Sequence, residues 1–325
     1  GRFYPDHFDI AITHNSFEDT CVGATDFTYI GQPFSYLNEP ELTITAKNAF
    51  GVTTQNYTEA DYQKLAADNI SRTFPIEDSI KKGADDATEM VVSRTITDGT
   101  LTLPPTSSLG VMTYTFNGSD SFTYTKDSNS QVGEFTMDYD IVIDSVQDSD
   151  GANASVSLAS SIPTSNTVSP TGVNLRFGRW TIENTFGSER TDLVFPMAIQ
   201  YYDGTNFVTN TLDDTCTTFD GDDDANHSLS ITGLSNPLPA TNLTAISGSG
   251  TFALGLAELQ IAKPSDNPAS QGQIRLTYDD APSWLQYDWS WNGTDPLSFT
   301  ESPSAVATFG LFRGNDRIIY QREVH

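Results

Sequence analysis

Apolar and aromatic residues recur at every second position over long stretches of this sequence, with turn-forming residues between the runs. The clearest runs are 27–32 (FTYIGQ), 41–47 (ELTITAK), 111–116 (VMTYTF), 134–146 (EFTMDYDIVIDSV) and 251–261. Successive side chains of a β-strand point to opposite faces, so a period of two places one face in a core and the other in solvent. Thr, Val and Tyr dominate these runs, as is typical of strands. The pattern predicts an all-β fold of antiparallel strands.

A single segment has helical spacing instead. In residues 59–69 (EADYQKLAADN), Tyr62, Leu65 and Ala66 would share one face of a helix whose first turn Thr58 is placed to cap. We therefore expect at most one short helix, crossing between strands.

The length of 325 residues favours two domains over one. Periodicity is lost in SSIPTSNTVSPTG, which ends at Gly172 and is rich in Ser, Thr, Pro and Gly. We expect domains at 1–160 and 173–325 with a linker at 161–172. Residues 42–58 weakly resemble 194–211, which favours two immunoglobulin-like or related β-sandwich domains in tandem; chance similarity between two hairpins is the alternative.

The charge balance excludes some partners. Asp and Glu number 43 against 16 Lys and Arg, giving a formal net charge of −27. Binding to nucleic acid or to an anionic membrane depends on Lys and Arg, so neither is an expected partner. No stretch reaches the roughly 20 apolar residues of a membrane span. The first residues lack the features of a signal peptide, so we expect any export signal to lie upstream of this chain.

The two cysteines, Cys21 and Cys216, lie far apart in the sequence. In an oxidising compartment they can pair and bring the two halves of the chain together, which would stabilise the fold by roughly 5 kcal/mol in the chain-entropy model. Two independent buried thiols are the alternative.

Two acidic clusters are candidate calcium loops, because Ca²⁺ takes several oxygen ligands at once. Asp148 and Asp150 begin a D-x-D-G sequence, but the twelfth position, where a bidentate acid is expected, is Ala159. The second cluster contains Asp220, Asp222 and Asp224. Solvated loops that add solubility are the alternative for both clusters. Calcium is therefore the one cofactor that we consider, and the sequence does not require it.

Four aromatic residues alternate in WLQYDWSW: Trp284, Tyr287, Trp289 and Trp291 are the candidate ligand-binding residues. Exposed rings of this kind can stack on sugars, which would suit a lectin-like module that binds surface glycans. Packing in a sandwich core is the alternative.

Motifs for catalysis are missing from the sequence. There is no G-x-S-x-G elbow, and no pair among the four histidines has the spacing of a zinc hydrolase. Carboxylates are abundant, so a glycoside hydrolase remains an alternative function. We expect a protein that is not an enzyme.

Several phrases occur in an order that resembles one family. They are RFYPDHF (2–8), CVGATDFTYIGQPF (21–34), TAKNAFGVTTQNY (45–57), RFGRW (176–180), GSE (187–189), QYYDGTNFVTNTLDDTCT (200–217), WLQYDW (284–289) and ATFGLFRGNDRIIYQRE (307–323). Together they resemble the C-terminal region of the family of protein Q of MSHA (mannose-sensitive haemagglutinin) pilus biogenesis, a region of unknown function, and the likeness covers essentially the whole chain.

The resemblance implies a module at the cell surface of a Gram-negative bacterium, linked with a type IV pilus and contributing to its assembly or to surface adhesion. Its expected partners are pilus or other envelope proteins. The family offers no catalytic residue to carry over. Cys21 and Cys216 both fall inside shared phrases, and the resemblance therefore favours a structural disulfide.

Overall fold

A computed structural model gives the fold of the chain. It describes residues 4–23, 25–58, 62–82, 89–103, 108–126, 131–152, 154, 166–221, 229–233, 238, 246–265, 270–290 and 297–310.

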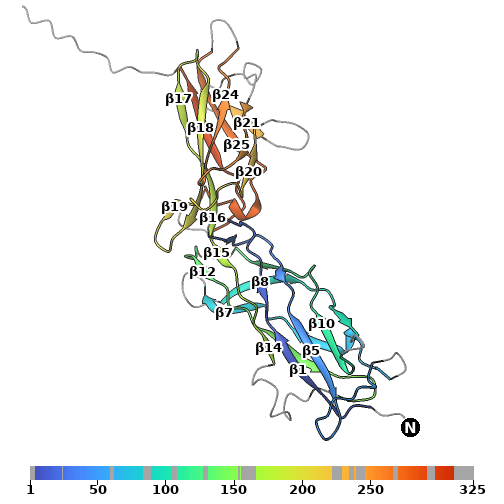
Figure 1. Cartoon of the computed structure of the whole chain (residues 1–325). Helices are drawn as coiled ribbons and strands as arrows, with labels where there is room; N and C mark the ends of the chain where they lie inside the picture. The colour runs from blue at the N-terminus through green and yellow to red at the C-terminus, as the bar shows by residue number, and fades with distance from the viewer. Residues whose placement is uncertain are drawn as a thin grey trace, which may run out of the picture. The chain divides into compact units, whose positions relative to one another are not determined.

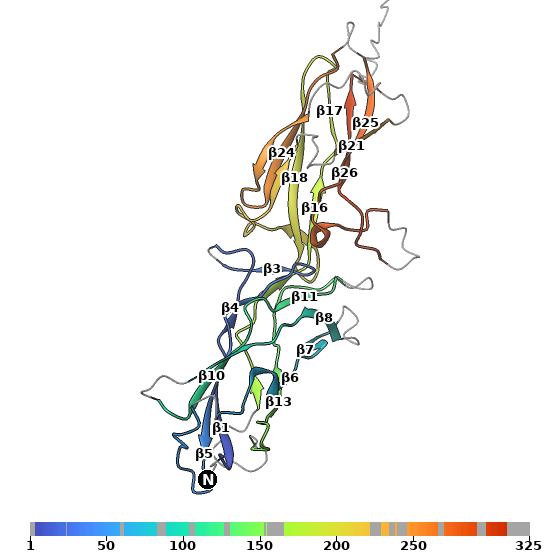
Figure 2. The ribbon, with the colours of Figure 1, turned by 90° about the vertical axis from the view of Figure 1, so that its right-hand side faces the viewer.

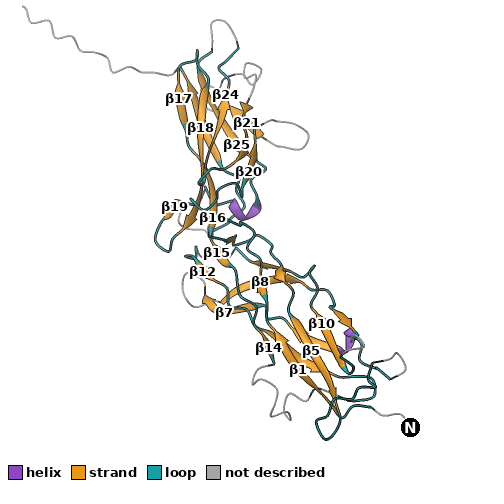
Figure 3. Ribbon diagram, viewed as in Figure 1, coloured by secondary structure: helices purple, strands orange, loops and turns teal. Residues whose placement is uncertain are grey.

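The prediction of an all-β fold is confirmed. Strands form nearly all of the regular structure, and the two helices are 3₁₀ helices of three residues each, η1 at Ala67–Asn69 and η3 at Ser283–Leu285, in the described part of the chain (Figures 1 and 3). The chain divides into two compact units. Unit 1 comprises 1–177 together with 202–206, and unit 2 comprises 178–201 together with 207–325.

Unit 1 contains the first fifteen strands. They are β1 (His7–Thr13), β2 (Ser16–Phe17), β3 (Thr28–Tyr29), β4 (Tyr36–Asn38), β5 (Glu41–Lys47), β6 (Ile70–Thr73), β7 (Glu77–Lys82), β8 (Glu89–Thr95), β9 (Thr100–Thr102), β10 (Val111–Thr115), β11 (Ser121–Tyr124), β12 (Phe135–Thr136), β13 (Ile141–Val146), β14 (Thr167–Val168) and β15 (Asn174–Arg176). Their sheets have the orders β1-β5-β10-β9, β11-β8-β7, β12-β15-β3, β14-β13-β6 and β2-β4.

The central strand of the longest sheet in unit 1 shows why the period of two matters. In β5, Leu42, Ile44 and Ala46 are fully buried while the residues between them are partly exposed. Leu42 pairs with Ile12 of β1 on one side and with Tyr114 of β10 on the other. The buried face of the strand therefore builds one wall of the core.

Aromatic rings fill the middle of that core. Phe122 is fully buried, and its ring centroid lies 5.0 Å from that of Phe17, 5.6 Å from Tyr139 and 6.1 Å from Phe74. These rings come from β11, β2, the segment after β6 and the segment before β13. Edge-on and tilted contacts of this kind add to the burial of apolar area. The cluster therefore joins strands from several sheets of unit 1.

The predicted helix over 59–69 is wrong in the part that the structure describes. Residues 62–66 are irregular, and only η1 (Ala67–Asn69) is helical. The hydroxyl of Tyr57 accepts hydrogen bonds from the backbone N–H groups of Lys64 (3.1 Å) and Leu65 (2.9 Å). Because a side chain takes these two donors and Leu65 is drawn into the core, the segment has no need of helical hydrogen bonds.

Part of the expected linker lies within unit 1. Residues 161–165 lie outside the described residues, whereas β14 (Thr167–Val168) pairs with β13. The backbone N–H of Phe17 donates to the carbonyl of Thr171 at 2.9 Å. Gly172 packs so closely that an added Cβ would lie 2.0 Å from the carbonyl oxygen of Met137. Ser, Thr, Pro and Gly in this segment therefore serve strand pairing and close approach as well as turns.

Unit 2 contains the remaining strands. They are β16 (Gly178–Ile182), β17 (Thr185–Gly187), β18 (Leu193–Tyr202, whose last residue falls in unit 1), β19 (Phe207–Thr209), β20 (Thr218–Asp220), β21 (Leu229–Gly233), β22 (Ile246–Ser247), β23 (Ser249–Thr251), β24 (Leu256–Ile261), β25 (Gly272–Tyr278) and β26 (Ser304–Phe309). One sheet has the order β16-β18-β24-β22 with β19 beside β18, another has the order β17-β26-β25-β21, and β20 pairs with β23.

The two larger sheets of unit 2 pack face to face as a sandwich, with β18 and β24 on one side and β25 and β26 on the other (Figure 2). Trp180 of β16 is fully buried between them, with its ring 4.6 Å from Tyr278 of β25 and 5.0 Å from Phe252. Burial again alternates along β18. The buried residues on the inward face of this strand are Leu193, Phe195, Met197 and Ile199.

Substituting Tyr57 with Phe should destabilise unit 1. The change leaves the ring in place but removes the hydroxyl, which donates to Asp148 Oδ2 at 2.7 Å and accepts the N–H groups of Lys64 and Leu65. Leaving these buried groups without a partner should lower the free energy of unfolding by about 2–4 kcal/mol. Urea denaturation measures the change. Tyr62→Phe, at a side chain that is 40% exposed, is the matched control; an equal effect of both variants would contradict this account.

Candidate functional site

The aromatic residues singled out in the sequence lie next to a hairpin of unit 2. Trp284 lies in η3 and is half-buried, Tyr287 and Trp289 follow it, and Trp291 lies outside the described residues. The ring centroids of Tyr287 and Trp289 are 5.1 Å apart. Trp289 is 38% exposed, so one ring of the pair reaches the surface.

Short polar contacts fix the base of this hairpin. Tyr287 and Glu301 exchange two backbone hydrogen bonds of 3.1 Å. The Asp288 carboxylate accepts the N–H of Ser298 at 2.8 Å, and the Glu301 carboxylate accepts the N–H of Ser290 at 2.8 Å and also its hydroxyl. Trp289 therefore stands on a backbone that is held on both sides of it.

Arg179 of β16 joins these rings. The carbon at the centre of its guanidinium lies 3.6 Å from the ring centroid of Phe207, 5.1 Å from that of Tyr287 and 5.3 Å from that of Trp289. Its Nε donates to Gln200 Oε1 at 2.9 Å. We call Arg179, Gln200, Phe207, Tyr287 and Trp289 the arginine–aromatic cluster.

The electrostatics of the cluster follow from partial burial. Burial lowers the pKa of the Arg179 guanidinium below its usual range, while the hydroxyl of Tyr287 opposes this by accepting a hydrogen bond. The negative faces of three rings further favour the cation. Arg179 therefore stays charged and is fixed in orientation.

Sequence reasoning missed Arg179, Gln200 and Phe207. The three residues come from β16, β18 and β19, and Arg179 and Gln200 are direct partners in the register of β16 with β18. To place these three residues beside WLQYDWSW, one would need to know how the strands pair. No local sequence pattern predicts that pairing.

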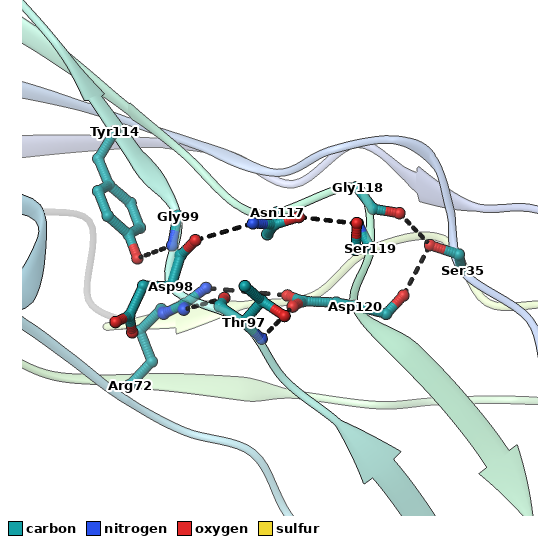
Figure 4. Close-up of polar contacts among 10 residues, drawn as sticks. All are labelled: Ser35, Arg72, Thr97, Asp98, Gly99, Tyr114, Asn117, Gly118, Ser119 and Asp120. Atoms are coloured by element: carbon teal, nitrogen blue, oxygen red, sulfur yellow. Dashed lines mark hydrogen bonds and ion pairs between the residues drawn. The ribbon is translucent and has the colours of Figure 1, made fainter.

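Unit 1 holds a second arrangement of chemical interest, a buried charge pair (Figure 4). The side chains of Arg72 and Asp120 are 4% and 0% exposed, and Arg72 Nη1 lies 4.0 Å from Asp120 Oδ2. The Arg72 guanidinium lies over Phe116, 4.6 Å from its ring centroid, and within 5.3 Å of the ring centroids of Phe74 and Tyr114. Burial raises the pKa of the Asp120 carboxyl, and Arg72 partly offsets the rise.

Hydrogen bonds around this pair tie two loops together. Asp120 Oδ1 accepts the N–H of Thr97 at 2.8 Å, and Arg72 Nη2 donates to the carbonyl of Thr97 at 3.2 Å. The side chain of Asn117 donates to the carbonyl of Asp98 at 2.9 Å (Figure 4). Within the described residues, neither Arg72 Nη1 nor Asp120 Oδ2 has a hydrogen-bond partner. The arrangement therefore positions the two loops, but the hydrogen-bonding capacity of the ion pair itself is only partly used.

Two open cavities lie in unit 1. One, of about 730 Å³, is lined by Arg72, Arg94 and Asp98 among others. The other, of about 450 Å³, is lined by Glu18 and Asp19 among others. Burial raises the pKa of Asp19 to about 6, and Asp26 adds to the rise.

The neighbours of Asp19 decide how its carboxyl is used. Its Oδ1 accepts the hydroxyl of Thr28 and the backbone N–H of Asn174, both at 3.1 Å. A glycoside hydrolase needs two carboxyl groups placed across a sugar bond, one to donate a proton and one to act as base or nucleophile. Asp19 has the raised pKa of such an acid, but it is anchored to the strands around it.

The candidate calcium ligands lie in different settings. Asp148 is buried, and its Oδ1 accepts the N–H groups of Asp150 (3.1 Å) and Ala152 (2.9 Å) while Oδ2 accepts the Tyr57 hydroxyl. Asp150 is exposed, and the N–H of Asp220 donates to the Tyr278 hydroxyl at 2.9 Å.

Asp222 and Asp224 lie outside the described residues. Among the residues that the structure does describe, no group of three or more His, Cys, Asp or Glu side chains is arranged to hold a metal ion. Asp148 closes its own turn with its carboxylate, and calcium binding at these loops stays a prediction.

The structure contains a disulfide between Cys21 and Cys216, and no free cysteine. Cys21 is buried, and it exchanges backbone hydrogen bonds of 2.9 and 3.1 Å with Phe27. The turn just before Cys216 is held by Asp213, which is fully buried and accepts both the N–H (2.9 Å) and the hydroxyl (2.6 Å) of Thr217. Both cysteines thus lie in tightly hydrogen-bonded backbone.

Comparison with protein families gives two matches that together span the chain. Residues 1–172 match the family model described as DUF6701, third domain, and residues 176–324 match DUF6701, fourth domain. A search of curated proteins gives no match.

Comparison with solved structures gives distant similarities. They include FdeC, an Escherichia coli adhesin (13% identity, TM-score 0.23), the Yersinia pseudotuberculosis adhesin InvE (10%, 0.23) and the ectodomain of mouse nectin-like molecule 4 (8%, 0.21). The matches cover 95%, 93% and 94% of this chain, and 66%, 58% and 64% of the respective solved chains. At these TM-scores the likeness carries no inference about function.

Helices long and apolar enough to cross a membrane do not occur in the part of the chain that the structure describes.

Replacing Asp120 with Ala should destabilise unit 1 strongly. The variant leaves the buried Arg72 cation without its carboxylate and the N–H of Thr97 without its acceptor. We expect the free energy of unfolding to fall by about 3 kcal/mol or more, measured by urea denaturation. Asp98→Ala is the control, because the contact shown for Asp98 uses its backbone carbonyl. If the two variants unfold alike, the buried pair contributes nothing specific.

Asp19 should make the stability of unit 1 depend on pH. Its pKa in the fold, about 6, lies above the ordinary 3.8, so the folded state holds the proton more tightly than the unfolded chain. This contribution to the free energy of unfolding is complete below about pH 3.8 and is lost as pH rises through about 6.

The variant Asp19→Asn stays uncharged and should escape this loss. Its melting temperature relative to the natural chain should therefore be higher at pH 7.5 than at pH 4.5. Thermal unfolding at both pH values measures the difference, and Asp68→Asn, at an exposed carboxylate, is the control. A difference that does not change with pH would show that Asp19 titrates normally.

Proposed function

The chain belongs to the DUF6701 family, and from that membership and its structure we propose that it is a non-catalytic module of an exported bacterial cell-surface protein. Its role is to contribute to the assembly of an MSHA-type (type IV) pilus or to surface adhesion, by presenting a folded contact surface. The partners are pilus or other envelope proteins.

The disulfide between Cys21 and Cys216 is the observation that carries the proposal. Disulfides form and persist in oxidising compartments and are rare in the cytosol, where thiols are kept reduced. Both cysteines of the chain are used in this bond, so no reactive thiol remains for catalysis or metal binding. The bond therefore supports export and a structural use of both residues.

The charge and the fold support the same compartment and role. A net charge of −27 favours solubility and opposes binding to nucleic acid. Aromatic side chains pack in the cores of both units. Phe122 in unit 1 and Trp180 in unit 2 are examples that are fully buried. Such β-rich units suit a module that presents a surface outside the cell.

Association with a pilus rests on the sequence phrases. The resemblance to the C-terminal region of MSHA pilus biogenesis protein Q runs from residue 2 to residue 323, and a Gram-negative surface location comes with it. Calcium remains a candidate ligand of the acidic loops.

The absence of a catalytic role is also part of the proposal. Asp19 and Asp120 both line the smaller cavity, and burial raises the pKa of both carboxyls. Oδ1 of Asp19 already accepts from Thr28 and Asn174, and Asp120 is held by the N–H of Thr97 and by Arg72. These contacts support a structural use of both carboxyls over glycoside hydrolysis. Release of reducing sugar from any polysaccharide by the purified chain, lost in Asp19→Asn, would reverse this assignment.

The location and the bond can be tested together in the bacterium that produces the protein. Antibodies against residues 1–325 should label intact cells, with gold particles beside pili in electron micrographs. A maleimide should modify Cys21 and Cys216 only after treatment with a reductant. Deleting the segment should lower surface attachment without slowing growth. Labelling seen only after lysis, or a thiol reactive without reductant, would rule out an exported disulfide-bonded module.

A further inference from the structure

We propose that the arginine–aromatic cluster of unit 2 is a binding site for a neutral sugar ring, stacked on Trp289. The proposal goes beyond the function above, because a surface module can act in assembly without any sugar site. It commits to residues that the sequence pattern alone did not bring together.

Trp289 differs from the large aromatic residues of the core. Trp180 is fully buried, whereas Trp289 is 38% exposed although its neighbour Tyr287 packs against Phe207 at 5.3 Å and against Phe299 at 5.6 Å. Leaving part of a large ring in water forgoes apolar burial. A ring that is exposed and yet fixed in place is suited to receive the apolar C–H face of a pyranose.

The orientation of Trp289 is set before any ligand arrives. Its edge-to-face contact with Tyr287 (60° between planes) and the hydrogen bonds from Ser290 to Glu301 hold it from two sides. Arg179 lies over the same group of rings. Preorganisation of this kind removes the ordering cost that a mobile side chain would bring to binding.

Polar groups next to the ring match the hydroxyls of a sugar. The guanidinium of Arg179 has five N–H donors, and Nε uses Gln200 as its acceptor while the Tyr287 hydroxyl takes another. The Glu301 carboxylate already accepts the N–H and hydroxyl of Ser290, but each of its oxygens has a further lone pair on the same hairpin as the ring. Sugar hydroxyls both donate and accept, so a donor and an acceptor beside one stacking face can bind a single ring.

The charge of the surroundings favours a neutral ligand over an acidic one. Asp288 and Glu301 lie on the hairpin that carries Trp289, and the whole chain has a net charge of −27. These negative charges outnumber the single Arg179 cation of the cluster, so a uronate or sialate is disfavoured, whereas hexoses and N-acetylhexosamines are not. A protein partner would need about 800 Å² on each side, much more than one ring and its polar neighbours provide.

A purely structural role makes a different prediction. If the cluster only anchors the hairpin, Trp289→Ala lowers the melting temperature and no glycan distinguishes the variant from the natural chain. If the ring is a binding platform, binding falls while the fold persists, because the substituted ring is partly exposed.

The test is an array of neutral oligosaccharides of hexoses and N-acetylhexosamines, with sialylated and uronate-containing glycans as a second arm, probed with the complete 325-residue chain. The strongest neutral binder is then titrated by calorimetry. We expect Trp289→Ala to weaken its binding by about tenfold or more. Trp289→Phe, which keeps an aromatic face, should restore much of the affinity.

Phe186→Ala is the matched control, since Phe186 is a 71% exposed aromatic residue of the same unit and lies in β17. It should bind as the natural chain does. Melting curves of all variants report folding separately from binding. The proposal is overturned if no neutral glycan binds, if only acidic glycans bind, or if Trp289→Ala and Phe186→Ala bind equally well while folded.

Discussion

The packing of cations on aromatic rings is the interaction on which both units depend. In the part of the chain that the structure describes, four basic residues lie over rings. Taking one ring for each, they are Arg72 over Phe116, Lys126 over Phe177, Arg176 over Phe27 and Arg179 over Phe207. A buried or partly buried cation loses hydration, and attraction to the ring face returns part of that loss. Burial still lowers the pKa of Lys126 to about 7, so its contact with the Phe177 ring does not make up for the lost hydration.

Much of the fold could be predicted because strand burial has a short period. Leu42 and Ile44 in β5 and Phe195 in β18 are buried in the alternation that the sequence shows. The prediction of a helix over 59–69 was wrong because of a contact made in the folded chain. The hydroxyl of Tyr57 accepts hydrogen bonds from backbone N–H groups that a helix would use. Local propensity cannot anticipate an acceptor that the fold brings from outside the segment.

The candidate site was predictable only in part. The alternation in WLQYDWSW placed Tyr287 and Trp289 side by side, because residues two apart share a face. Arg179 enters through the pairing of β16 with β18, and Asp120 meets Arg72 across 48 positions of sequence. Such neighbours are set by sheet register, for which the sequence carries no local signal. The same distinction explains Asp148, an acid in a calcium-like motif that binds its own turn.

The bond between Cys21 and Cys216 also has a mechanical consequence. Tension applied to the chain on either side of it passes through the sulfur atoms, so residues 22–215 carry no load while the bond is intact. That loop would be on the order of 600 Å long if fully extended. In the proposed role at the cell surface, this length would be held inside the loop while the chain is under tension, and a reductant would let the chain lengthen by that amount.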